Sequence, residues 1–245
     1  MLYFKLFLKS KIAVYTTMKF IGDIFNLFYP DVCLCCNEYL TENESDICIT
    51  CRHDLPLTNF SFEKDNLVEK TFYGRIPVEN ATALFYYLKK GKIQQLIHQL
   101  KYKKHQEIGV FIGDWLGDEM NESNRFNTID CIIPVPLHSK KLKKRGYNQV
   151  TSFGKSLSEK LNIPYFENIL VRISSTKTQT KKLRFERWKN VEELFSVENN
   201  STLENKHILL IDDVITTGAT LEACYKALSN IKNLKISIAC MAYTK

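Results

Sequence analysis

One stretch of this 245-residue chain decides its fold: Ile208-Leu-Leu-Ile-Asp-Asp-Val-Ile-Thr-Thr-Gly-Ala-Thr220. A continuous apolar run predicts a buried strand, and two adjacent carboxylates, Asp212 and Asp213, stand at its end. A short loop of threonines with one glycine follows, and a helical pattern starts at Thr220. The sequence therefore predicts a strand, a loop and a helix N-terminus in direct succession.

The loop has the chemistry of a phosphate site, and it consists of Thr216, Thr217, Gly218, Ala219 and Thr220. At a helix N-terminus, free backbone N–H groups and the positive end of the helix dipole both favour an anion. The glycine permits a close approach or a positive φ, and the three threonine hydroxyls add hydrogen-bond donors. We therefore expect a phosphate group in this loop.

The acid pair points to a second part of the same ligand. Carboxylates repel a phosphate, but they accept hydroxyl donors well. Asp212 and Asp213 thus fit a ligand with hydroxyls one sugar-width from its phosphate, as in a ribose 5-phosphate. Neither a Walker A loop nor a Gly-x-Gly-x-x-Gly fingerprint occurs in the chain. Without the threonine loop, the two acids would indicate no more than an acidic strand end.

Strands alternate with helices along most of the chain. The expected strands cover 81–87, 129–135, 207–211 and 236–242, and the expected helices cover 93–100, 107–121, 148–161 and 220–229. Such alternation is typical of an α/β fold with a mainly parallel sheet that is covered by helices on both faces. Loops at the carboxyl ends of the strands should then form the ligand crevice.

The composition is that of a globular protein, with 44% apolar and 25% charged residues. It excludes wholesale disorder and suits one mid-sized domain plus a small appendage. No apolar run approaches the ~20 residues of a membrane span. Residues 1–17 lack the features of a signal peptide, and Met18 is a natural start. We expect 1–17 to be an upstream extension, with a plain amphipathic helix as the alternative.

Five of the eight cysteines lie close together near the N-terminus. Four of them form two C-x-x-C pairs, namely Cys33, Cys36, Cys48 and Cys51. This spacing predicts a closed structural zinc site with four thiolate ligands. Cys35 is the spare cysteine, and His53 is an alternative ligand that is more readily explained as a surface residue. Clustered thiols without an export signal favour the reducing cytoplasm.

The net charge of +7 is concentrated in one segment. Residues 138–189 contain fourteen Lys or Arg and three Glu, a net +11, which leaves −4 for the rest of the chain. The segment points to a polyanionic partner, either a nucleic acid or a phosphate-rich small molecule, with a solvated lysine-rich surface as the alternative. Among its interleaved aromatic residues, Trp188 is the best candidate for stacking on a base.

Taken together, these motifs resemble those of the ComF family, a group of competence-related proteins similar to type I phosphoribosyltransferases. The 208–220 stretch resembles the signature by which those enzymes bind phosphoribosyl diphosphate (PRPP). The other matching motifs are Phe85-Tyr-Tyr, Leu100-Lys-Tyr102, Ile133-Pro-Val-Pro-Leu-His138, Arg145-Gly-Tyr-Asn-Gln149, Thr178-Gln179 with Arg184, Arg187, Asn190 and Val191, and the four-cysteine module. The resemblance covers nearly everything from Met18 onward.

The resemblance implies a type I phosphoribosyltransferase fold in which Asp212 and Asp213 are catalytic and hold the ribose hydroxyls. The loop 216–220 would hold the 5-phosphate. The diphosphate would lie on Pro134, Val135, Pro136 and Leu137. A mobile basic lid over Lys140–Gln149, together with two more distant arginines, would contact it through Lys144, Arg145, Asn148, Gln149, Arg184 and Arg187. Mg²⁺ would bridge the diphosphate and sugar oxygens.

Two functions fit this resemblance. The first is a PRPP-binding protein linked to DNA uptake and natural transformation, with single-stranded DNA and competence proteins as possible partners. The second is an active phosphoribosyltransferase on a nucleobase or amine, without a DNA role. In either case the sequence predicts that Asp213→Asn and Gly218→Val weaken PRPP binding without unfolding the chain. The expected parts are the extension 1–17, a zinc-ribbon module over 18–60, a linker over 61–80 and the phosphoribosyltransferase-like domain over 81–245.

Overall fold

A computed structural model of the chain describes residues 30–173, 194–198 and 200–244. The chain divides into two compact units, with the border between Asp54 and Leu55. The first unit holds the cysteine cluster, and the second holds the sheet. Within the described ranges, no helix combines the length and the apolar character that a membrane crossing requires.

The first unit is organised around its cysteines. Its described part contains the short helix α2 (Ile49–His53) and an isolated antiparallel bridge between Val32 and Tyr39. The helix begins after Cys48, whose sulfur accepts a hydrogen bond from the backbone N–H of Cys51 at 3.4 Å.

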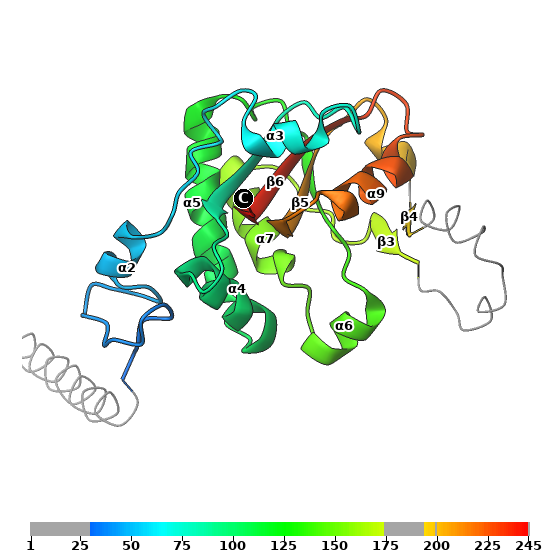
Figure 1. Ribbon diagram of the computed structural model, residues 1–245. Coiled ribbons are helices and arrows are strands. Elements are labelled where there is room, and N and C mark those ends of the chain that lie inside the picture. Colours follow the sequence, from blue (N-terminus) through cyan, green and yellow to red (C-terminus); the bar gives the residue numbers. More distant parts are fainter. Residues whose placement is uncertain (1–29, 174–193, 199, 245) are drawn as a thin grey trace, which may run out of the picture. The chain divides into compact units, whose positions relative to one another are not determined.

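Four parallel strands form the sheet of the second unit, in the order β1-β6-β5-β2 (Figure 1). The strands are β1 (Ala81–Tyr86), β2 (Cys131–Pro134), β5 (His207–Ile215) and β6 (Lys235–Tyr243). The central strands β5 and β6 are buried along almost their whole length, which explains their continuous apolar sequences. The expected α/β fold is confirmed, and the acid pair lies on a central strand.

Helices cover both faces of the sheet (Figure 1). On one face, Phe72 shares a core with Ile208 and Leu210 of β5. On the other face, Gly154 packs against Ile211 of β5. Successive side chains of a strand point to opposite faces, so Ile211 faces away from the side of Ile208 and Leu210. The first face is covered by α3 (Leu67–Phe72) and α9 (Ala219–Leu228), and the second by α4 (Lys92–Tyr102), α5 (Glu107–Ser123) and α7 (Val150–Leu161).

All the strands and helices that the sequence predicts in the second unit are present, with ends that shift by a few residues. The largest shift is at the decisive strand, which was expected to end at Ile211 and runs on to Ile215. Beyond Ile211 the strand stays paired in parallel with β6: Asp212 lies opposite Cys240, and Val214 lies opposite Ala242. The acid pair is therefore held inside a paired strand, which fixes its backbone.

The prediction that residues 61–80 form a linker is wrong. These residues carry α3 and contribute Val68, Phe72 and Ile76 to the core of the second unit. The apolar positions recur every four residues, but polar residues between them obscured the helical pattern. Asn66 caps the helix by accepting hydrogen bonds from two backbone N–H groups of its first turn. The border of the first unit likewise lies at Asp54 and not at residue 60.

Four further elements of the second unit were not expected from the sequence, one of them the short 3₁₀ helix η2 (Asn200–Leu203). Helix α6 (Ser139–Arg145) follows β2 and occupies most of the stretch that was expected to be a mobile lid. Strands β3 (Leu170–Arg172) and β4 (Phe195–Val197) form a separate antiparallel pair. These strands are three residues long, which is too short for a periodic pattern to stand out in the sequence.

Candidate functional site

The candidate site lies at the carboxyl edge of the sheet, where β2 ends beside β5. Pro134, the last residue of β2, lies opposite Ile211, which directly precedes the acid pair. The backbone N–H of Val135 donates to the carbonyl of Ile211 at 2.9 Å, so the pairing continues into the following loop. The structure thus brings the expected diphosphate loop, residues 134–137, next to Asp212 and Asp213.

The expected phosphate loop encloses a small cavity at the start of α9. Its volume is about 40 Å³, and it is lined by Asp212 and by residues 214–221. Thr216, Thr217 and Thr220 are exposed, and α9 begins at Ala219 with Gly218 as its N-cap. One end of the cavity is therefore a helix N-terminus with hydroxyl donors, and the other end is a carboxylate. This is the arrangement that a phosphorylated sugar requires.

Gly218 is needed for two separate reasons. Its φ of +71° lies in the left-handed region, where the backbone of a residue with a side chain is strained. A Cβ at this position would also lie only 2.7 Å from Cε1 of Phe72 in α3. The prediction that Gly218→Val weakens PRPP binding without unfolding the chain now includes a cost in stability, because a side chain here would push against Phe72.

Arg75 braces the phosphate loop, and sequence analysis did not identify it. Its Nη1 donates to the carbonyl of Thr217 at 2.6 Å, and its Nε donates to Glu222 at 3.0 Å. In a trans peptide the following N–H points away from the carbonyl, so this contact turns the N–H of Gly218 to the opposite side of the loop. Glu222 lies in the first turn of α9, where its charge would repel a phosphate, and it is paired with Arg75 and Lys226.

Asp213 is held by two partners that come from other elements. The ammonium of Lys101, at the end of α4, lies 2.7 Å from Oδ2 of Asp213, and the amide Nε2 of Gln149 donates to the same oxygen at 2.7 Å. Asp213 is 8% exposed, and its backbone N–H donates to Oδ1 of Asp212 at 2.8 Å. The carboxylate therefore has a charged partner that the sequence motif alone did not reveal.

The two acids are not equivalent electrostatically. Burial raises the pKa of Asp212 above its ordinary range, and the negative charge of Asp213 raises it further. The more distant cation of Lys101 acts on the pKa in the opposite direction but does not cancel the rise. A ligand that brings hydroxyl donors or a divalent cation would favour the ionised form of Asp212, so ligand binding and proton release are coupled here.

The expected lid residues form an anchored junction between α6 and α7. Nη1 of Arg145 donates to Oε1 of Gln149 at 2.5 Å, and Nδ2 of Asn148 donates to the carbonyl of Val135 at 3.1 Å. The Tyr147 hydroxyl donates to a backbone carbonyl at the end of α4. Arg145, Asn148 and Gln149 are thus brought to the site, whereas Lys144 is exposed on α6.

A second and larger cavity adjoins the diphosphate loop. Its volume is about 520 Å³, and it lies between α6, the beginning of α7 and β3. Apolar and polar groups both line it, among them Pro136, Leu137, Leu142, Tyr147, Leu170 and Arg172. A cavity of this size is large enough for a small organic molecule.

The four cysteines of the two C-x-x-C pairs form one cluster. Their sulfur atoms all lie within 4.8 Å of one another, and Sγ of Cys36 and Sγ of Cys48 are 3.8 Å apart. Burial would raise the pKa of Cys33, but backbone N–H donors, the first of them from Cys48, lower it to about 6. The side chain of His53 is 91% exposed and lies beside Asp54, so it takes no part in the cluster. The cluster could hold a structural metal ion.

Several predicted positions lie outside the described residues. They are Arg184 and Arg187, the candidate stacking residue Trp188, and the motif residues Thr178, Gln179, Asn190 and Val191.

Comparisons with known proteins find both a matching domain family and similar whole proteins. Residues 150–245 match the phosphoribosyl transferase domain family. The chain is 37% identical over 140 residues to Competence protein F of Haemophilus influenzae, covering 56% of this chain and 61% of that protein. It is 27% identical over 155 residues to DNA utilization protein YhgH of Escherichia coli K12, covering 62% and 67%. Over 97 residues it is 36% identical to Competence protein ComFC of Bacillus subtilis, covering 40% and 37%. The chain thus spans about three fifths of the length of Competence protein F.

Solved structures with a similar arrangement include the glutamine PRPP amidotransferase of Bacillus subtilis, complexed with ADP and GMP. It has a TM-score of 0.39 and 17% identity, and the match covers 58% of this chain and 30% of that one. The adenine phosphoribosyltransferase of Leishmania tarentolae has a TM-score of 0.33 and 15% identity, with 58% and 73% coverage.

Proposed function

We propose that the chain is a ComF-family protein that binds PRPP and serves DNA uptake. The proposal rests on its similarity to Competence protein F, to Competence protein ComFC and to the phosphoribosyl transferase domain family. The observation that carries the PRPP proposal is the cavity at the end of β5, which joins a carboxylate to a helix N-terminus. Asp212 and Asp213 would accept the ribose hydroxyls, and the loop 216–220 would bind the 5-phosphate. The diphosphate would lie over residues 134–137 at the end of β2.

Mg²⁺ fits the same site through the acid pair and the anionic ligand, because it prefers hard oxygen ligands. When bound, it would neutralise charge on the diphosphate. The protein's own groups orient the ligand: Arg75 fixes the phosphate loop, and Gln149 holds Asp213. If the ligand turns over, the bond from the anomeric carbon to the diphosphate breaks, and an acceptor bonds to that carbon. The protein would contribute mainly by positioning these groups and stabilising charge.

The DNA role is supported by the names of the similar proteins, which are competence and DNA utilization proteins. We propose single-stranded DNA and components of the uptake machinery as partners, and the cytoplasm as the location. An active transferase on a nucleobase or amine is the second candidate. The cavity of about 520 Å³ beside Leu137 favours it, because an acceptor needs space next to the diphosphate.

A titration calorimetry experiment with PRPP and Mg²⁺ tests the proposal directly. We expect saturable binding that ribose 5-phosphate weakens by competition. Incubation with a panel of nucleobases and amines, followed by measurement of released diphosphate, separates binding from turnover. Absence of PRPP binding would overturn the proposed function. Binding without diphosphate release from any acceptor would favour the binding protein over the transferase.

We further propose zinc as the metal of the cysteine cluster. Tetrahedral Zn²⁺ with Zn–S bonds of about 2.3 Å places its sulfur ligands about 3.8 Å apart. The separation between Cys36 and Cys48 has that value. Elemental analysis should find about one zinc ion per chain. The variant Cys36→Ser should lose it, whereas Cys35→Ser should retain it, since Cys35 lies outside the cluster. Zinc-free wild-type protein, or equal loss in both variants, would contradict the assignment.

Replacing Arg75 by Met should weaken PRPP binding about fivefold, the equivalent of about 1 kcal/mol, because the Thr217 carbonyl loses its donor. Calorimetric titration with PRPP measures the change. The matched control is Lys226→Met, which removes the other cation on Glu222 but leaves the Thr217 contact in place. If both variants lose the same affinity for PRPP, the effect comes from the unpaired charge of Glu222 and not from the orientation of the loop.

A further inference from the structure

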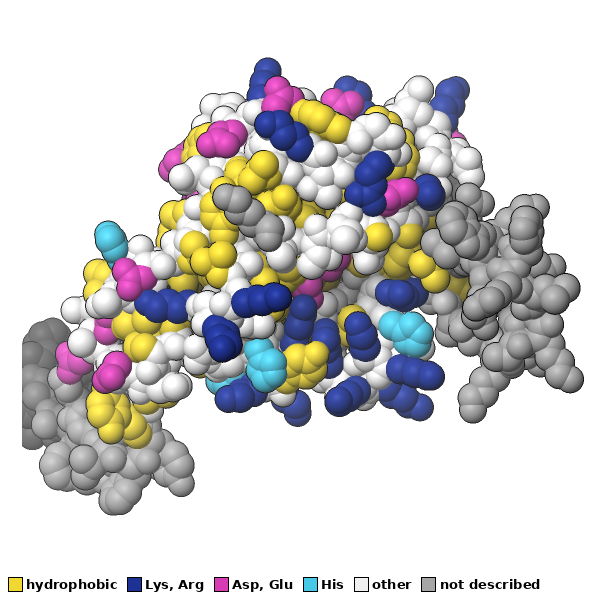
Figure 2. Space-filling model, viewed as in Figure 1, with side chains coloured by type: hydrophobic (Ala, Val, Ile, Leu, Met, Phe, Trp, Pro, Cys, Tyr) yellow, Lys and Arg dark blue, Asp and Glu magenta, His cyan; other side chains and the backbone are white. Residues whose placement is uncertain are grey.

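Two segments that are distant in sequence form one basic surface on the second unit. Residues 101–104, at the end of α4, and residues 139–145, in α6, contain eight Lys or Arg and no Asp or Glu. In the space-filling view, Lys and Arg side chains gather along the lower edge, where Figure 1 places α4 and α6 (Figure 2). The lysines of α6 and Lys103 and Lys104 are exposed. A surface of one sign of charge attracts a polyanion.

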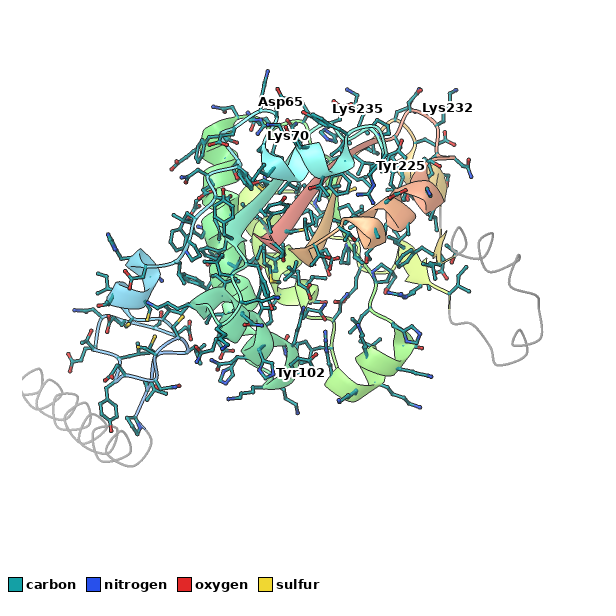
Figure 3. All side chains as sticks on the ribbon, viewed as in Figure 1. Asp65, Lys70, Tyr102, Tyr225, Lys232 and Lys235 are labelled. Atoms are coloured by element: carbon teal, nitrogen blue, oxygen red, sulfur yellow. The ribbon has the colours of Figure 1, made fainter. Side chains whose placement is uncertain are left out.

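Flat and apolar groups lie among these cations. The side chain of Tyr102 lies at the end of α4 (Figure 3) and is 54% exposed. The ring of Tyr102 is 4.8 Å from the ring of His98, and the guanidinium of Arg145 lies 5.0 Å from its centroid. Leu142 of α6 is 43% exposed. Cations combined with exposed aromatic rings are characteristic of surfaces that bind single-stranded nucleic acid, whose bases stack on such rings.

The basic surface is connected to the acid pair through two side chains. Lys101 is one of the eight cations in these two segments. Its ammonium, however, lies 2.7 Å from Oδ2 of Asp213, and its side chain is only 21% exposed. Arg145 contacts Tyr102 on one side and, through Gln149, reaches the same oxygen of Asp213 on the other. Oδ2 of Asp213 therefore receives both Lys101 and Gln149.

We propose that the end of α4 and helix α6 form a binding surface for single-stranded nucleic acid, and that PRPP binding strengthens it by releasing Lys101 from Asp213. This inference rests on the proposed function, since it takes the acid pair as the site of the ribose hydroxyls. Those hydroxyls donate to Asp213 and compete with Lys101 for it. The released ammonium then adds one cation beside Tyr102.

Linkage requires the effect to be reciprocal. A nucleic acid strand that attracts Lys101 leaves Asp213 open to the sugar, so it must strengthen PRPP binding by the same factor. Couplings between sites are typically about 5- to 150-fold. We expect the lower end of that range, about fivefold, because a single ion pair is exchanged.

The salt dependence of binding measures the number of cations that the strand engages. For single strands, the logarithm of affinity falls with the logarithm of salt concentration with a slope of about −0.7 per neutralised phosphate. A short fluorescent oligothymidylate is titrated with the full chain at several salt concentrations, with and without PRPP and Mg²⁺. We expect PRPP to raise the affinity about fivefold and to steepen the slope by about 0.7.

Two matched variants separate release of Lys101 from a general loss of charge. In Lys101→Met, PRPP should no longer alter the affinity or the slope. In Lys103→Met, the slope of the salt dependence should be shallower by about 0.7 both with and without PRPP. The rise in affinity that PRPP causes should persist. Lys103 is the appropriate control because it is the exposed neighbour of Lys101 with the same charge.

The remaining outcomes would overturn the inference in distinguishable ways. PRPP binding with no change in oligonucleotide affinity would remove the coupling and leave the proposed function in place. Binding of anionic lipid vesicles but not of the oligonucleotide would assign the surface to a membrane. Absence of PRPP binding in calorimetry would remove the proposed function and this inference together.

Discussion

Replacing Asp213 by Asn should weaken PRPP binding about 10- to 100-fold, which corresponds to about 1.5–3 kcal/mol for hydrogen bonds to a charged group. An amide has one acceptor oxygen, whereas the carboxylate has two. Its NH₂ group is a donor and cannot accept a hydrogen bond from the ligand's hydroxyls. The same change removes the ion pair with Lys101. Calorimetric titration with PRPP and Mg²⁺ measures the loss, and thermal unfolding measures the cost in stability.

Asp130→Asn is the matched control for this variant. Like Asp213, Asp130 accepts a hydrogen bond and pairs with a lysine: the backbone N–H of His207 donates to it at 2.7 Å, and Lys206 lies at 3.0 Å. It lies just before β2, at the opposite edge of the sheet from the site. The variant should therefore bind PRPP normally, and it should lose less stability than Asp213→Asn because its ion pair is more exposed. If both variants lose PRPP binding to the same extent, the assignment of Asp213 to the ligand is wrong.

The pH dependence of binding provides a second readout of the same prediction. Because the pKa of Asp212 is raised by burial and by Asp213, lowering the pH protonates this acid before an ordinary carboxyl. The protonated form is a poor acceptor for hydroxyls and for Mg²⁺, so PRPP affinity should increase as pH rises through this pKa. In Asp213→Asn the neighbouring charge is gone, so the increase should move to lower pH. An unchanged profile would show that Asp212 does not contact the ligand.

Gly218→Ala should both destabilise the second unit and abolish tight PRPP binding. A left-handed conformation costs a residue with a Cβ about 1–2 kcal/mol, and overpacking against Phe72 adds about 1–3 kcal/mol. The loop can relieve this strain only by moving its backbone N–H groups away from the phosphate position. Denaturant unfolding and PRPP titration measure the two effects, and Gly218→Val should be worse in both.

Gly74 is a close internal control for the conformational part of this cost. Its φ is also +71°, but an added Cβ would meet nothing within 4 Å. Gly74→Ala should therefore show the strain of the left-handed conformation without the clash. Phe72→Leu combined with Gly218→Ala should recover part of the lost stability. If Gly218→Ala and Gly74→Ala cost the same free energy of unfolding, the contact with Phe72 does not restrict this position.

Much of the fold follows from local sequence patterns. Buried parallel strands such as β5 and β6 show as continuous apolar runs because both their faces are covered. The helices that face the core show as apolar residues at helical spacing, as α4 and α7 do. Helix α3 was missed because it spans only Leu67–Phe72, and its buried positions are separated by polar residues.

The sequence by itself determined the functional groups whose members are adjacent in the chain. These are the acid pair, the threonine loop with its glycine, and the two C-x-x-C pairs, because their chemistry depends on spacing within a few residues. Only the tertiary structure decided which distant side chains complete the site. Arg75 reaches the phosphate loop from beyond α3, and Lys101 reaches Asp213 from the end of α4. Such contacts leave no periodicity or spacing in a single sequence, since packing of the helices on the sheet brings them together.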